Sequence, residues 1–82
     1  MSTGVDLRKA NLKNADLRGC NLENADLQFV SLAGARLDGA NLKNVNLQFA
    51  NLGGCNWRDA SCLDGVNVKN TYGDVIPNNH QL

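Results

Sequence analysis

The sequence has little of what marks most functional classes. Its 82 residues contain one proline, one histidine, one tryptophan, one tyrosine and two phenylalanines, and eight basic residues balance eight acidic ones. A neutral chain of mixed sign has no bulk attraction for nucleic acid or an anionic membrane. No apolar run approaches the ~18 residues of a membrane-spanning helix, and the opening residues MSTGVDLRK lack the apolar stretch of a signal peptide.

Reactive side chains are equally scarce. The three cysteines, Cys20, Cys55 and Cys62, lack CxxC spacing and fall on apolar positions of a repeat, which predicts buried thiols in a reducing, cytoplasmic location. His80 is alone in a polar tail, so no cluster of metal ligands is expected. No carboxylate pair stands apart as an acid–base couple. We therefore predict a protein that is not an enzyme and has no catalytic residue, metal, cofactor or small-molecule substrate.

What the sequence does have is a period of five. Leucine occupies every fifth position from Leu7 to Leu52, and the next two such positions hold Trp57 and Cys62. The residue two before each of these twelve centres is small or medium-sized and apolar, and the residue just before is Asp or Asn in nine cases. Two positions after the centre, seven of twelve residues are Gly or Asn. The phase slips by one at Leu63-Asp64-Gly65, and one unit then resumes at 66–70.

A period of five fits neither regular element. A strand would place successive leucines on opposite faces, and a helix would spread them around its whole surface. A chain that turns a corner every five residues points each leucine inward. Gly and Asn after each centre support this, because the third residue of a type II turn needs a positive φ. Four such corners close a square coil of twenty residues, although composition alone does not distinguish four sides from three.

The units ANLKN, ADLRG, CNLEN and ANLGG resemble the pentapeptide-repeat family, whose consensus is A(D/N)LXX. This resemblance implies an all-β fold, a right-handed quadrilateral β-helix of about three coils. We expect the β-helix to span residues 5–70. Residues 71–82 would then form a short irregular C-terminal cap or tail, with Tyr72 among the apolar residues that cover the last coil.

A twenty-residue coil makes predictions about charge. Asp16 should lie beneath Arg36 and Glu23 beneath Lys43, so that opposite charges on neighbouring coils attract each other. Asp6 beneath Asp26 is the one like-charge contact expected. A fifteen-residue coil gives poorer columns.

The candidate interaction residues are Gln28, Phe29, Gln48, Phe49 and Trp57. Phe29 and Phe49 stand where Gly or Asn is usual, so we expect a different turn type there and rings that point outward. The rings either pack on each other or form a ridge that binds a partner. Trp57 replaces a central leucine, which indicates that the coil widens and ends there, or that the indole contributes to binding.

Three functions remain open. The first is a structural or protein–protein interaction module, possible in a larger adaptor, because repeat solenoids present extended rigid faces. Its partner would be another protein or a second copy, since an uncovered first coil invites edge association. The second is a DNA-mimic modulator of the topoisomerase gyrase, which the resemblance suggests but the mixed charge disfavours. The third is a repeat scaffold or spacer without its own ligand.

Overall fold

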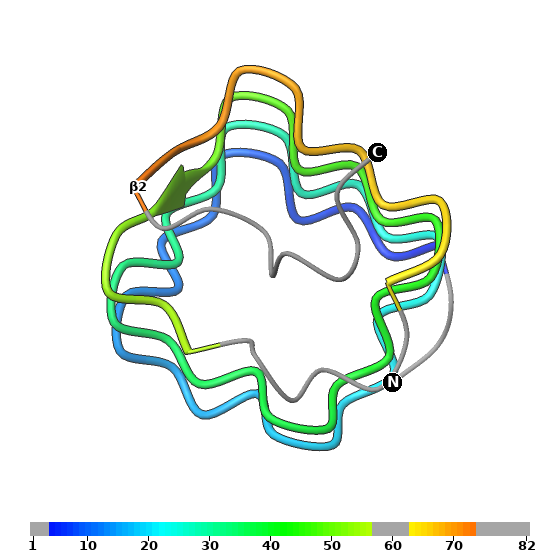
Figure 1. Ribbon diagram of the computed structural model, residues 1–82, viewed down its shortest axis with the longest axis horizontal. Coiled ribbons are helices and arrows are strands. Elements are labelled where there is room, and N and C mark those ends of the chain that lie inside the picture. The colour runs from blue at the N-terminus through cyan, green and yellow to red at the C-terminus, as the bar shows by residue number, and fades with distance from the viewer. Residues whose placement is uncertain (1–3, 57–62, 74–82) are drawn as a thin grey trace.

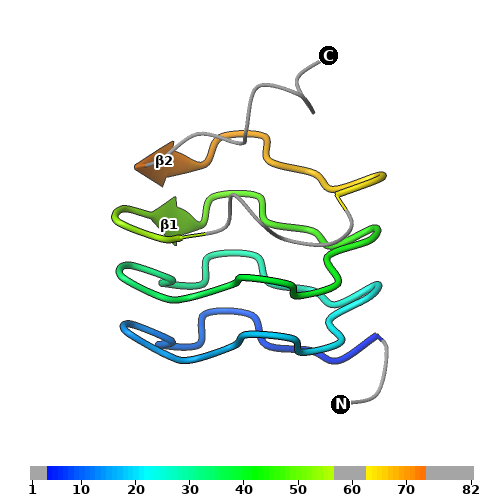
Figure 2. The same ribbon diagram turned by 60° about the horizontal axis from the view of Figure 1, so that its bottom comes forward.

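A computed structural model describes residues 4–56 and 63–73 of the chain. Within these ranges the chain forms a stack of square coils, seen end-on in Figure 1 and from the side in Figure 2. Two short strands, β1 (Asn51–Leu52) and β2 (Tyr72–Gly73), pair in parallel, and no helix occurs in the described ranges. Isolated parallel bridges join residues twenty apart, among them Asp6–Asp26 and Arg36–Asn56. Twenty residues in units of five give four sides, so the predicted four-sided coil is confirmed over a fifteen-residue one.

Each corner is a tight turn that begins at the central residue. At the first corner the N–H of Ala10 donates to the carbonyl of Leu7 over 3.0 Å, and Lys9 between them has a φ of 65°. The same bond and the same positive φ recur at corner after corner, with Asn14, Gly19 and Asn24 in the third position. A positive φ at that position is what a type II turn requires. The predicted turn is therefore the one that the chain adopts.

The leucines fill the interior. Leu22, Leu27, Leu32, Leu37, Leu42, Leu47 and Leu52 are no more than 1% exposed. The small residues that follow each turn, such as Ala35, Ala40 and Ala50, are buried beside them. Burying one leucine side chain contributes about 1.5–3 kcal/mol, so this column is the main source of stability.

The Asp and Asn residues before each centre brace the turns. The side-chain oxygen of Asn51 accepts the N–H of Gly53 over 3.0 Å, and that of Asn46 accepts the N–H of Gln48 over 3.1 Å. Seven further Asp and Asn residues do the same, namely Asp6, Asn11, Asp16, Asn21, Asp26, Asn41 and Asn67. The repeated polar position is thus explained by structure, as such residues often bond to backbone two positions on.

The extra residue lies before Leu63. From Asn67 onward, bridges join residues twenty-one apart, as in Asn46–Asn67 and Asn51–Tyr72. Leu63 is 4% exposed, and Val66 donates back to its carbonyl, so Leu63 takes a central position. The prediction that Leu63-Asp64-Gly65 itself carries the extra residue is therefore wrong. Tyr72 continues a column of side positions and is 61% exposed, so it does not cover the last coil as expected.

Ion pairs form mainly within one coil. Asp16 stacks beneath Arg36 as predicted, but its carboxylate pairs with Arg18 at 2.6 Å. Glu23 accepts from the Asn41 amide over 3.3 Å, and no ion pair with Lys43 is seen in the described ranges. The predicted attraction between coils is thus largely replaced by pairs across a single turn. The exception is Arg8, which reaches up to Asp26 at 3.7 Å.

Candidate functional site

Phe29 and Phe49 form an aromatic ladder on the outside of the solenoid. Their ring centroids lie 4.9 Å apart, and the ring planes differ by 6°. This spacing matches the roughly 4.8 Å between neighbouring strands, because the identical segment Leu-Gln-Phe recurs one coil later. Phe29 is 53% exposed and Phe49 is 41% exposed. The prediction of outward rings is confirmed, and the rings also pack on each other.

The backbone beneath the ladder is unusual. Phe29 has a φ of 63° and Phe49 a φ of 64°, and each sits in the same turn as every other corner, closed by Val30 and Ala50. The prediction of a different turn type is therefore wrong. Coils above and below impose one corner geometry on the whole column. A bulky residue in this left-handed region is a genuine outlier that costs about 1 kcal/mol or more.

The ladder has polar neighbours at both ends. Backbone bonds place Lys9 one coil before Phe29, and Asn70 follows Phe49 in the same column. The adjoining column contains Arg8, Gln28, Gln48 and Lys69. The amide nitrogen of Gln28 donates to Asp26 over 2.9 Å, so this side chain turns away from the rings. Four of the five predicted site residues thus share one face, whereas Trp57 lies outside the described residues.

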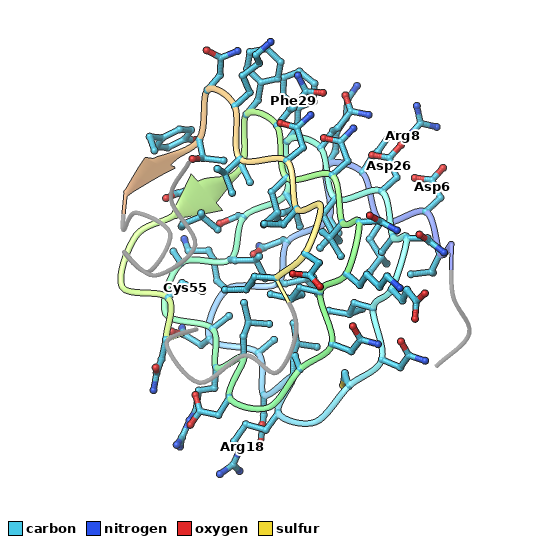
Figure 3. All side chains as sticks on the ribbon, turned by 45° about the vertical axis from the view of Figure 1, so that its right-hand side comes forward. Asp6, Arg8, Arg18, Asp26, Phe29 and Cys55 are labelled. Carbon is cyan, nitrogen blue, oxygen red and sulfur yellow. The ribbon has the colours of Figure 1, made fainter. Side chains whose placement is uncertain are left out.

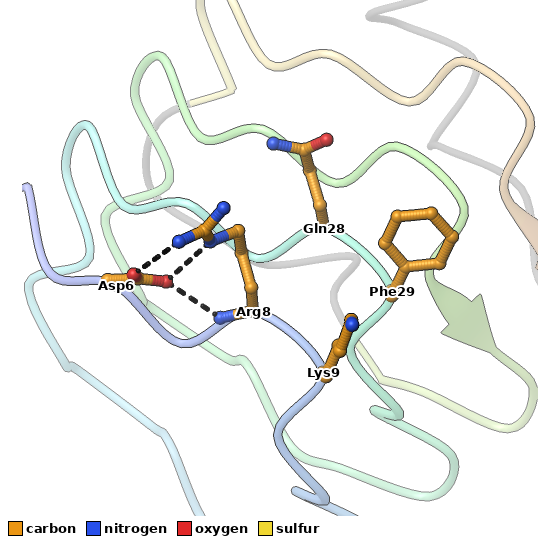
Figure 4. A pocket seen from close by; sticks show the side chains of 5 residues that line it. All are labelled: Asp6, Arg8, Lys9, Gln28 and Phe29. Atoms are coloured by element: carbon orange, nitrogen blue, oxygen red, sulfur yellow. Dashed lines mark hydrogen bonds and ion pairs between the residues drawn. The ribbon is translucent and has the colours of Figure 1, made fainter.

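A hollow of about 330 Å³ opens at the N-terminal end of the ladder. It is lined by Asp6, Arg8, Lys9, Gln28 and Phe29 (Figure 4). The same face carries Asp26, and Arg18 lies well away from it (Figure 3). Sequence reasoning missed this hollow, because Lys9 follows a centre and was not distinguished from other corner residues. The signal that could have found it is the twenty-residue register between Lys9 and Phe29.

Arg8 organises the floor of the hollow. Its guanidinium donates twice to the carboxylate of Asp6, both over 3.0 Å, and approaches Asp26 at 3.7 Å. The expected like-charge contact of Asp6 and Asp26 exists, but one cation serves both acids. Hydrogen bonds from the Arg8 side chain and backbone N–H lower the pKa of Asp6 below its ordinary value. The same pair raises the pKa of Arg8.

This arrangement suits contact and not catalysis. The acidic groups of the hollow are held by Arg8, which leaves neither poised to move a proton. No group of three metal-ligating side chains is found in residues 4–56 and 63–73. No helix in that part of the chain is long and apolar enough to cross a membrane. What the face offers is a flat aromatic surface bordered by charge.

A square solenoid of stacked five-residue units, with leucine inside and turns at each corner, defines a class of β-helical repeat protein. The chain belongs to the pentapeptide-repeat family, which it matches with eight copies over residues 3–24, 20–59 and 40–72. The family typically provides structural or interaction modules and is generally non-enzymatic. No curated protein sequence matches the chain significantly.

Two solved structures are similar. The pentapeptide repeat protein Rfr23 from the cyanobacterium Cyanothece 51142 is 33% identical, with a TM-score of 0.51 over 88% of this chain and 63% of that one. HetL from Nostoc sp. strain PCC 7120, a pentapeptide repeat protein involved in heterocyst differentiation regulation, is 28% identical. It gives a TM-score of 0.36 over 80% of this chain and 37% of its own. The present chain thus spans less than two thirds of either protein.

Proposed function

We propose that the chain is a non-enzymatic interaction module whose aromatic ladder binds a protein partner. One observation supports this above the others: two exposed phenylalanines stand at corners where the backbone disfavours them. Asn fills the same corner position at Asn14, Asn24, Asn44 and Asn70 at lower cost. Strain at an exposed, apolar position indicates a function that the residue serves there.

The surroundings of the ladder suggest the chemistry of the partner. An apolar or aromatic side chain would lie on the ring faces, since stacked aromatic pairs contribute about 0.5–1.5 kcal/mol beyond area burial. Lys9 borders the ladder at one end and Lys69 at the other, and neither forms an ion pair within the described part of the chain. We propose that acidic groups of the partner flank its apolar residue. Such charges set orientation and association rate more than affinity.

The competing functions have less support. A DNA mimic requires columns of negative charge, whereas these columns mix Asp with Arg, Asn and Lys. We expect no inhibition of gyrase supercoiling at low micromolar protein. A spacer without a ligand has no need of exposed rings at strained corners. Free Cys20 and Cys55 are consistent with a proposed reducing, cytoplasmic location.

The test compares capture by three immobilised proteins from cytosolic extract. The first is the wild type, and the second carries Phe29→Asn with Phe49→Asn. The third adds Asn24→Phe and Asn44→Phe to these, which moves the ladder by one corner while composition and corner geometry stay the same. A specific partner binds the wild type and loses at least tenfold with both variants. Equal capture by the wild type and the relocated ladder would show mere stickiness and refute the proposal.

A further inference from the structure

The first coil ends in a ring of open backbone groups. In the next coil, Asp26 donates its N–H to Val5 and accepts the N–H of Leu7, and Ser31, Arg36 and Asn41 behave alike. The equivalent residues of the first coil are Asp6, Asn11, Asp16 and Asn21. Their backbone N–H and C=O groups form no backbone hydrogen bond with any residue in the described ranges. Each side therefore presents one donor and one acceptor along the solenoid axis, as an unpaired strand edge does.

The interior is also open at this end. Val5, Leu7, Ala10, Leu12, Leu17 and Cys20 are only partly buried. Their equivalents twenty residues later, such as Leu27 and Leu32, are 1% exposed. An apolar centre ringed by free backbone groups is what one coil normally offers to the next. The surface therefore fits another coil of the same kind.

We propose that this end pairs with the same end of a second copy, related by a twofold axis perpendicular to the solenoid. In an antiparallel pair, two opposed residues exchange both N–H···O bonds. Each of the four edge residues has both groups available for such an exchange. The coil end is a spiral ramp, and a half-turn about a radial line carries such a ramp onto itself. Two copies of this end are therefore self-complementary in shape.

The charge pattern selects the axis. The step of the ramp lies at the corner where Gly4 bonds to Glu23, so the twofold must pass through that corner. Asp6 then faces Asn21 of the second copy, and Asn11 faces Asp16. An axis through the middle of a side would instead set aspartate against aspartate. The alternation of Asp and Asn around the coil thus avoids a like-charge pair only for a diagonal axis, and one diagonal passes through the step.

The pairing should be weak. The Cα extents of 27 × 20 × 20 Å limit one coil end to roughly 500 Å², below the ~800 Å² per partner of a typical stable interface. Exposed corner charges also oppose it, because Arg8 would approach Arg18 of the second copy. We expect dissociation constants of about 10–100 μM, typical of transient contacts, and tighter association as salt screens the rim.

Sedimentation equilibrium of the untagged N-terminus from about 5 μM to 1 mM brackets that range of affinity. The wild type should pass from monomer to dimer. Asn11→Asp with Asn21→Asp places two carboxylates at each strand pair and should weaken dimerisation at least tenfold, while the acceptors for Lys13 and Glu23 remain. Asn51→Asp with Asn67→Asp adds the same charge away from this end, keeps the acceptors for Gly53 and Lys69, and should dimerise like the wild type.

Hydrogen exchange locates the contact. The amides of Asp6, Asn11, Asp16 and Asn21 should exchange more slowly as concentration rises, whereas exposed amides elsewhere do not change. A monomer at 1 mM overturns the proposal. So does a dimer that the Asn11→Asp, Asn21→Asp variant leaves intact, or one that the Phe29→Asn, Phe49→Asn variant abolishes, since that result would place the contact on the aromatic ladder.

Discussion

The rings of Phe29 and Phe49 lie parallel, with 4.9 Å between their centroids. This contact exists because the two residues occupy one corner column in successive coils. Stacking contributes about 0.5–1.5 kcal/mol, whereas each left-handed φ costs about 1 kcal/mol or more. The stack therefore offsets part of the strain without making the two phenylalanines a net source of stability.

Replacing both rings should leave the fold intact. For Phe29→Asn with Phe49→Asn we expect the free energy of unfolding to change by less than about 1 kcal/mol, because relief of strain balances loss of the stack. Urea unfolding measures this. The two single variants complete a double-mutant cycle, in which a coupling of about 0.5–1.5 kcal/mol reports the stack. A loss above about 2 kcal/mol would mean that the rings belong to the core.

The interior column should respond in the opposite way. Leu47 is fully buried, so Leu47→Ala should lower the free energy of unfolding by about 2–5 kcal/mol through lost burial and a cavity. Leu7 has the same repeat position but is only partly buried at the open end. Leu7→Ala is therefore the matched control, and thermal or urea unfolding should show a clearly smaller loss. Equal losses would contradict the burial gradient along the solenoid.

The sequence predicted the repeat geometry well. The period of five fixed which residues point inward, and Gly and Asn fixed the turn. Both follow from local preferences repeated many times. The corner at Phe29 was mispredicted because local preference opposes a positive φ there, whereas bonds to the coils on either side enforce it.

Two further errors have physical causes. Charges were expected to pair between coils, but the Arg18 side chain reaches Asp16 of its own turn more directly than any group one coil away. The position of the extra residue was ambiguous because Cys62 and Leu63 are both apolar, and either can serve as a centre. Burial of Leu63 decides between them. The hollow beside Phe29 required the three-dimensional register.

Glycines at corners should differ according to what lies beneath them. Gly34 and Gly39 have φ values of 72° and 71°. A Cβ on Gly34 would meet the side-chain oxygen of Asn14, whereas one on Gly39 would come no closer than 3.9 Å to Gly19. Gly39→Ala should cost about 1 kcal/mol from the backbone alone, and Gly34→Ala should cost more. The comparison is made by urea unfolding, and a smaller loss for Gly34→Ala would refute it.

The carboxyl of Asp16 should titrate well below an ordinary aspartate. A side-chain hydrogen bond from Arg18, supported by the Arg18 backbone N–H, lowers the pKa of Asp16 from 3.8 to about 2. Because the folded pKa is depressed, the associated stability is present above the ordinary pKa and is lost as the pH falls toward about 2. Carboxyl ¹³C titration should place the midpoint there in the wild type. Arg18→Gln should return the pKa most of the way to 3.8, whereas Arg36→Gln, which removes only the weakest contribution, should shift it little. A wild-type midpoint near 3.8 would show that the ion pair does not form in solution.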